Sequence, residues 1–372
     1  MINEGKFGSY EAVWMLSLFC CAKTILSFPR TMIEYGGTAG WFIPIISGLF
    51  GFLGFLIIIG LLKRFPGLTI VEAGKNAAGP VVGSIAALLY MMLFITITGT
   101  TLREFSESLK VMSLPVTPLA VILITIIITA AVCAHLGLET YSRLTLFIAI
   151  PMLVIIVLII VLTFNQYNIN YLLPILGKGP ENLFLYGIMR ITNFSELLFA
   201  GLIVNNVGGY KNCFKAGVYS IILATAVSAI VTAAVIMTFN VKMSEELFFP
   251  LLRLAKEISI GRFFQRCEAA FEIFWVSVIL IYCVFGIYSS SVIFARTFKI
   301  KSYKPLIPIF TVIITIIAFL PHDMKATFLF DSDVNRKYSS IIAFGVPLII
   351  LIIAILRKKR IKNTGGGEVR SL

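Results

Sequence analysis

The chain reads Lys23-Thr24-Ile25-Leu26-Ser27-Phe28-Pro29-Arg30 in the middle of its first apolar span. A second polar stretch, Arg190-Ile191-Thr192-Asn193-Phe194-Ser195-Glu196, interrupts the sixth apolar span at the corresponding place. Polar side chains and a helix-breaking proline are costly at membrane depth, where no water satisfies the freed groups. Such interruptions normally mark where a transporter-like protein holds its ligand. The two stretches therefore predict a binding site between two broken helices.

The composition is that of a polytopic membrane protein. Hydrophobic residues make up 59% of the chain and charged residues 13%, and the mean hydropathy is +0.97, which is far outside the range of soluble domains. Most apolar runs are near the roughly 20 residues that a helical span needs. The runs cover residues 10–33, 38–62, 81–112, 117–134, 142–164, 182–206, 214–239, 268–297, 305–320 and 338–356. We therefore expect an all-α integral membrane protein with about ten transmembrane helices.

Lysines and arginines indicate the orientation of the chain, because basic loops stay on the cytoplasmic side of a membrane. With the N-terminus inside, the inner loops and the tail carry Lys63, Arg64, Lys75, Arg143, Lys211, Lys215, Arg296, Lys299, Lys301, Lys304 and the basic run 357–362. Both termini are thus expected in the cytoplasm. The net charge of +13 is mostly a topology signal, and its scatter over separate loops argues against a nucleic-acid partner.

No motif for catalysis or metal binding stands out in the sequence. The six cysteines lie mainly in or beside apolar spans without metal-ligand spacing, which is typical of packing residues. Neither His135 nor His322 has a metal or nucleophile partner nearby in sequence, and no phosphate-loop or hydrolase motif is present. We therefore expect neither an enzyme nor a bound metal or cofactor.

The ten spans divide into two similar halves. Residues 1–164 form a first repeat of five helices, 165–180 an outer linker, 181–357 a second repeat, and 358–372 a basic cytoplasmic tail. Each half begins with an interrupted span and places an amphipathic stretch between its second and third spans. An odd number of crossings per half puts these stretches on opposite sides of the bilayer. Two sets of five spans with inverted topology are the plan of the LeuT-like transporters.

Several motifs also carry a family resemblance over nearly the whole chain. In order, they are Ile25-Leu26-Ser27-Phe28-Pro29-Arg30, Gly40-Trp41, Lys63-Arg64-Phe65-Pro66-Gly67 with Glu72, Leu114-Pro115-Val116-Thr117-Pro118, Gly137-Leu138-Glu139-Thr140-Tyr141-Ser142-Arg143, Asn170-Tyr171-Leu172-Leu173-Pro174, and Phe249-Pro250 with Arg266 and Trp275. This set resembles the spore germination permease family, the B subunits of nutrient germinant receptors. The resemblance implies a member of the amino acid, polyamine and organocation superfamily in the inner membrane of a bacterial endospore, working with an A and a C subunit.

One departure from that superfamily bears on the binding mode. Its members usually have a glycine-rich break in the first span, where backbone amides receive a ligand carboxylate, whereas this chain reads Cys20-Cys21-Ala22-Lys23-Thr24. The lysine ammonium is expected either to act as counter-charge to the ligand or to take the place of a coupling cation.

The candidate ligand-binding residues come from the two interruptions, and they include one pair of opposite charges. They are Lys23, Thr24, Ile25, Leu26, Ser27, Asn193, Phe194, Ser195 and Glu196. Lys23 and Glu196 are expected to pair, either as a structural fastening or as a gate that a zwitterionic nutrient opens. Cation or proton coupling is assigned to the same pair with Ser289 and Ser290 of the eighth span, although serines in membrane helices more often bond to their own backbone.

Three functions remain open from the sequence. The favoured one is a membrane subunit of a germinant receptor that binds a small nutrient, such as an amino acid, and signals to its partner subunits. The alternatives are a proton-coupled or facilitative amino acid transporter of the same superfamily, and an ion-conducting element opened by the nutrient. A shared architecture does not distinguish them, because fold does not dictate function.

Overall fold

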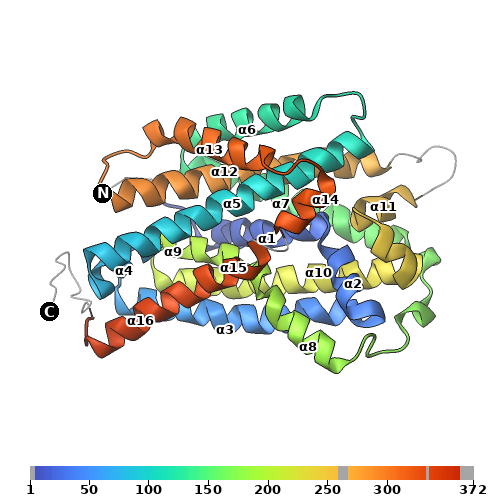
Figure 1. The fold of residues 1–372 in the computed structure, drawn as a ribbon, viewed down its shortest axis with the longest axis horizontal. Coiled ribbons are helices and arrows are strands. Elements are labelled where there is room, and N and C mark those ends of the chain that lie inside the picture. Colours follow the sequence, from blue (N-terminus) through green and yellow to red (C-terminus); the bar gives the residue numbers. More distant parts are fainter. Residues whose placement is uncertain (1–4, 259–266, 332–334, 361–372) are drawn as a thin grey trace.

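The computed structural model of the chain describes residues 5–258, 267–331 and 335–360, and these residues contain helices and no strand. The helices lie side by side along the long axis of the molecule (Figure 1). The first half contains α1 (Ser9–Ile25), α2 (Phe28–Gly36), η1 (Gly37–Phe42), α3 (Ile43–Arg64), α4 (Ile70–Ala78), α5 (Pro80–Met112), α6 (Leu119–His135) and α7 (Leu138–Leu162). The linker holds the short helices η2 (Phe164–Gln166) and η3 (Ile169–Leu172). The second half contains α8 (Pro180–Met189), η4 (Arg190–Phe199), α9 (Ala200–Ile203), α10 (Tyr210–Glu246), α11 (Pro250–Lys256), α12 (Cys267–Thr297), η5 (Lys304–Leu306), α13 (Ile307–Phe319), α14 (Met324–Phe330), α15 (Arg336–Ser340), η7 (Ile341–Gly345) and α16 (Val346–Leu356).

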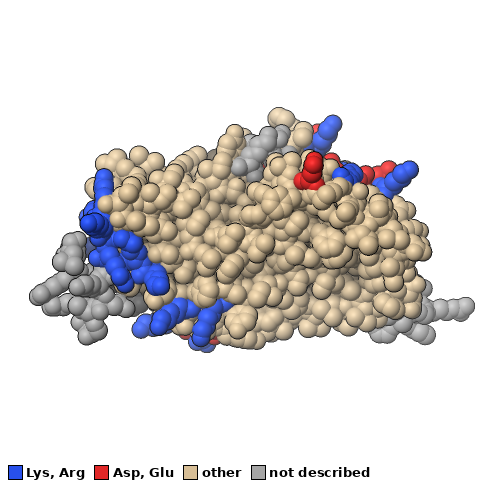
Figure 2. Space-filling view, turned by 90° about the horizontal axis from the view of Figure 1, so that it is seen from below, with Lys and Arg blue, Asp and Glu red and all other residues tan. Residues whose placement is uncertain are grey.

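The length and apolar character of these helices confirm an integral membrane protein. Among the described residues, seven helices are long and apolar enough to cross a bilayer, or eight if the bent pair α13 and α14 is one span. Each of the ten apolar runs expected from the sequence coincides with helical structure. On the face seen in Figure 2, basic side chains gather at one end of the molecule, mixed charges lie toward the other, and the band between them carries neither.

The first span is broken as its sequence predicts. Helix α1 ends at Ile25, and Leu26 leaves the helical conformation with φ −92° and ψ −133°. Helix α2 begins at Phe28 with Pro29 in its first turn, where a proline costs no hydrogen bond because the amide there has no partner within the helix. The change of direction leaves the Ser27 amide without a partner in either helix, and Leu26 and Ser27 are both buried.

The sixth span is interrupted in a different form. Between α8 and α9 the ten residues of η4 (Arg190–Phe199) wind as a 3-10 helix without a gap. Runs of this tighter helix longer than three or four residues are uncommon and often mark a functional hinge or strain. Nine of the ten residues of η4 are buried, so the polar stretch faces protein and not lipid.

The positions of two short helices place the halves in opposite orientations. The short helices α4 and α11, which follow the second span of each half, lie at opposite ends of the bundle in Figure 1. The residues at which the described chain begins and ends lie at the same end as α4: Asn206 Nδ2 donates to the carbonyl of Gly5 at 2.8 Å, and Arg357 NH1 donates to the carbonyl of Ala78 at 3.5 Å.

Of the residues singled out in the sequence, Arg266 and positions 361–372 of the basic tail lie outside the described residues.

Helix α1 lies in the middle of the molecule and contacts α7, α10, α12 and η4. Ten of its 17 residues are buried. In this position the polar side chains of α1 meet protein groups instead of lipid.

Candidate functional site

The two interruptions meet through an ion pair. The Nζ atom of Lys23, in the last turn of α1, lies 2.8 Å from Oε1 of Glu196 in η4. The side chain of Glu196 is 0% exposed and that of Lys23 is 21% exposed. The pair expected from the sequence is therefore formed, with its carboxylate in the protein interior and its ammonium partly accessible.

The Glu196 carboxylate has one engaged oxygen and one available oxygen. Oε1 also accepts a hydrogen bond of 2.7 Å from the hydroxyl of Tyr282 on α12. Oε2 is buried and accepts no hydrogen bond from any residue that the structure describes. A buried acceptor left unsatisfied is costly, about 1–3 kcal/mol or more for a charged group. This oxygen is thus suited to a donor that arrives with a ligand.

A second carboxylate, which the sequence reasoning did not single out, reaches the break in the first span. The backbone amide of Ser27 donates to Oε1 of Glu104 at 3.2 Å, and Glu104 belongs to α5 and is 7% exposed. The signal that would have found it is the charged group Arg103, Glu104 and Glu107 inside a long apolar helix, since intramembrane charges are functional candidates by default. The other two members of that group form an ion pair of 2.8 Å.

A small polar cavity adjoins Lys23 on the side of α3 and α10. Its walls are Cys20, Lys23, Thr24, Phe28, Pro44, Ser47, Asn193, Phe194, Ala224, Thr225 and Ser228, and its volume is about 10 Å³. Such a volume has room for about one water molecule. The hydroxyls of Thr24 and Ser228 share a hydrogen bond of 2.6 Å at this wall. The Nδ2 atom of Asn193 is buried and donates to none of the described residues.

The remaining candidate residues are buried but differ in what their polar groups do. Ile25 and Leu26 contribute apolar surface at the break. The Ser195 hydroxyl donates to the Thr192 carbonyl at 2.8 Å. In α12 the Ser290 hydroxyl donates to the Gly286 carbonyl at 2.7 Å, a bond within its own helix, whereas the buried Ser289 hydroxyl has no hydrogen-bond partner among the described residues. Cation or proton coupling at these serines stays a prediction.

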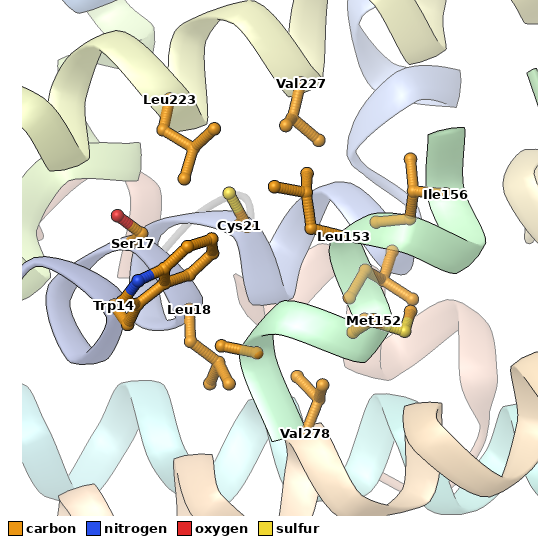
Figure 3. A pocket seen from close by; sticks show the side chains of 12 residues that line it. Trp14, Ser17, Leu18, Cys21, Met152, Leu153, Ile156, Leu223, Val227 and Val278 are labelled. Atoms are coloured by element: carbon orange, nitrogen blue, oxygen red, sulfur yellow. The ribbon is translucent and has the colours of Figure 1, made fainter. Parts of the chain in front are cut away.

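A second, apolar pocket lies on another side of α1. Figure 3 shows it between Trp14 and Cys21 of α1, Met152 and Leu153 of α7, and side chains of α10 and α12. Its volume is about 40 Å³ and no charged residue lines it. A charged molecule would lose its hydration in this pocket without compensation, so the polar candidate site is the one at Lys23 and Glu196.

No group of three or more His, Cys, Asp or Glu side chains that would hold a metal ion occurs in the described part of the chain.

Comparison with known proteins connects this architecture to a family. A family model described as spore germination protein matches residues 7–327. The chain belongs to the spore germination permease family. The resemblance seen in the sequence motifs is thereby confirmed, and the fold, the broken first helix and the intramembrane ion pair are features of this member.

Three relatives from Bacillus subtilis (strain 168) match this chain along nearly its whole length. Spore germination protein YndE is 25% identical over 362 residues, which cover 95% of this chain and 98% of that protein. Spore germination protein B2 is 21% identical over 96% of this chain and 97% of its own length. Spore germination protein KB is 22% identical over 99% of this chain and 100% of its own length.

Among solved structures, the fold is similar to Mhp1, a nucleobase-cation-symport-1 family transporter in a closed conformation with bromovinylhydantoin bound. The TM-score is 0.62 at 11% sequence identity, with 96% of this chain and 94% of that chain covered. The germination permease therefore has the LeuT-like transporter fold that its repeated spans predict.

Proposed function

We propose that this protein is the nutrient-sensing membrane subunit of a spore germinant receptor and that it binds a small amino acid between its two interrupted helices. The ion pair between Lys23 and Glu196 carries the proposal. In the empty protein it joins α1 to η4, and a zwitterion that offers a carboxylate to the lysine and an ammonium to the glutamate would separate the two. Such a ligand interacts differently with the paired and the separated states, which is what a conformational switch requires.

The burial of the pair supports this role. The Glu196 carboxylate lies out of contact with water, and its unbonded Oε2 provides an acceptor for a ligand ammonium. A charge-assisted hydrogen bond of this kind contributes about 1.5–3 kcal/mol.

Replacement of Glu196 by Gln tests the proposal in spores. The change keeps the size of the side chain and removes its charge, so we expect the nutrient concentration for half-maximal germination to rise about tenfold or more. Glu139→Gln is the matched control, because it removes one carboxylate from an exposed pair with Arg143 on α7. An unchanged dose response in Glu196→Gln spores would rule out the proposal that the nutrient separates Lys23 from Glu196.

A transporter is the second candidate, and the likeness to Mhp1 favours it, since that structure is a transporter with a small molecule bound. Uptake of a labelled amino acid into vesicles that contain only this protein distinguishes the two candidates. Uptake driven by a proton gradient supports a transporter, whereas binding without uptake supports a receptor.

The location and partners follow from the same proposal. The protein is placed in the inner membrane of the endospore with both termini in the cytoplasm, and it is expected to assemble with the A and C subunits of a receptor. Arg143 in the second turn of α7 and Arg357, which directly follows α16, support this orientation. Copurification of A and C subunits with an affinity-tagged copy from spore membranes tests the assembly.

A further inference from the structure

The break in the first span already holds a carboxylate. Backbone amides at the start of a helix attract anions, because they have no partner within the helix and lie at its positive end. At the start of α2 the amide of Ser27 instead donates to Glu104 of α5, a residue 77 positions away in sequence. A ligand carboxylate arriving at this amide would have to displace a buried side chain of its own charge.

Two hydrogen-bond donors, the Lys23 ammonium and the Asn193 amide, lie at the small polar cavity and not at the helix break. Lys23 and Asn193 both line the small cavity between α1, α3, η4 and α10. Asn193 is 7% exposed, yet its Nδ2 makes no hydrogen bond to a described residue. An ammonium and an unpaired amide donor at one cavity suit a carboxylate, which accepts on two oxygens.

We propose that the carboxylate of the ligand is held by Lys23 Nζ and Asn193 Nδ2 in this cavity, and that Glu104 occupies the amide of Ser27 so that the helix break does not bind carboxylates. This inference rests on the proposed function. It adds how the site distinguishes the carboxylate of a zwitterion from its ammonium. The ligand ammonium then lies toward Oε2 of Glu196. Glu104 is a specificity-determining residue in this arrangement, although it does not touch the ligand.

The size of the cavity adds a requirement. With room for about one water molecule, it takes a carboxylate only after its walls separate. The Thr24 to Ser228 hydrogen bond joins α1 to α10 at this wall, so entry of the carboxylate separates these two helices.

The test uses the purified full-length protein with potassium acetate as the carboxylate probe and potassium chloride at the same ionic strength as the reference. In the wild type we expect acetate to raise the melting temperature above the chloride value. The variant Asn193→Asp keeps the shape and replaces the donor by a carboxylate, and it should lose this difference. Asn193→Ala is a second variant in case the first does not fold. An acetate effect of wild-type size in either variant, or none in the wild type, overturns the proposal.

Hydrogen exchange of the Ser27 amide tests the role of Glu104 without any dependence on germination. In the wild type, acetate should leave the exchange rate of this amide unchanged. In Glu104→Ala, which removes the acceptor, the rate should rise at least tenfold, and acetate should then slow it, because the amide has become available. Glu107→Ala on the same helix is the matched control and should leave the rate at its wild-type value. Slowing of exchange by acetate in the wild type, or an unchanged rate in Glu104→Ala, contradicts the proposal even if nutrient-triggered germination follows the proposed function.

Discussion

Removal of the ammonium from the buried pair is expected to destabilise the protein more than removal of the carboxylate. In Lys23→Met, the Glu196 carboxylate keeps only the Tyr282 hydrogen bond and stays fully buried. Breaking a buried pair in this way costs about 3–5 kcal/mol. In Glu196→Leu the remaining charge is Lys23, whose side chain is 21% exposed and reaches water along its flexible stem. We expect the loss of stability in Glu196→Leu to be about half of that in Lys23→Met, because an ammonium that keeps part of its hydration loses less when its partner is removed.

The measurement is the free energy of unfolding in detergent for both single variants and for Lys23→Met/Glu196→Leu. The double variant removes both charges together, so it should be more stable than the sum of the single losses predicts, with a coupling energy of about 2–3 kcal/mol. Additive losses, or a larger loss for Glu196→Leu than for Lys23→Met, would refute the reasoning that the carboxylate is the more dependent member of the pair.

Three further changes test other contacts. Tyr282→Phe removes a hydrogen bond to a buried carboxylate and should lower the free energy of unfolding by about 1.5–3 kcal/mol, measured by the same denaturation. Gly286→Ala brings a Cβ atom into collision with the Thr98 side chain and should lower the free energy of unfolding by about 1–3 kcal/mol, seen as a lower melting temperature. Gly60→Ala is the control, because its nearest neighbour lies at 3.4 Å, and it should leave the melting temperature near the wild-type value. Lys75→Met removes the bond of 2.5 Å to the carbonyl at the end of α12 and should speed amide exchange in α4; an unchanged rate would show that this bond does not hold α4 in place.

The break in the first span could be predicted because its cause is local. Pro29 lacks an amide hydrogen and cannot continue α1, and the polar Ser27 precedes it. The form of the sixth interruption was beyond the sequence, because no proline stands in residues 190–196 and packing decides the winding there. Phe194 lies so close to α3 that a Cβ on Gly51 would be 2.6 Å from its ring, a constraint that only the folded protein reveals.

The contact between the two interrupted spans was predictable because the two halves correspond. Lys23 and Glu196 hold matching places in the first and sixth spans, so the pairing of opposite charges followed from the repeat. The contact of Glu104 could not be predicted in the same way. Its partner is a backbone amide, which every residue except proline carries, so no residue type in the sequence indicates this contact. The free donor of Asn193 was equally hidden, since whether a buried amide is satisfied depends on atoms from several helices.

The ten-residue 3-10 stretch of η4 has a mechanical consequence. A 3-10 helix rises about 2.0 Å and turns about 120° per residue, against about 1.5 Å and 100° in an α-helix. Rewinding residues Arg190–Phe199 as an α-helix would therefore shorten this span by about 5 Å and rotate its far end by about 200°. Such a rewinding after Lys23 separates from Glu196 would move α9, whose Leu202 carbonyl accepts a bond of 3.0 Å from Arg296 in the last turn of α12.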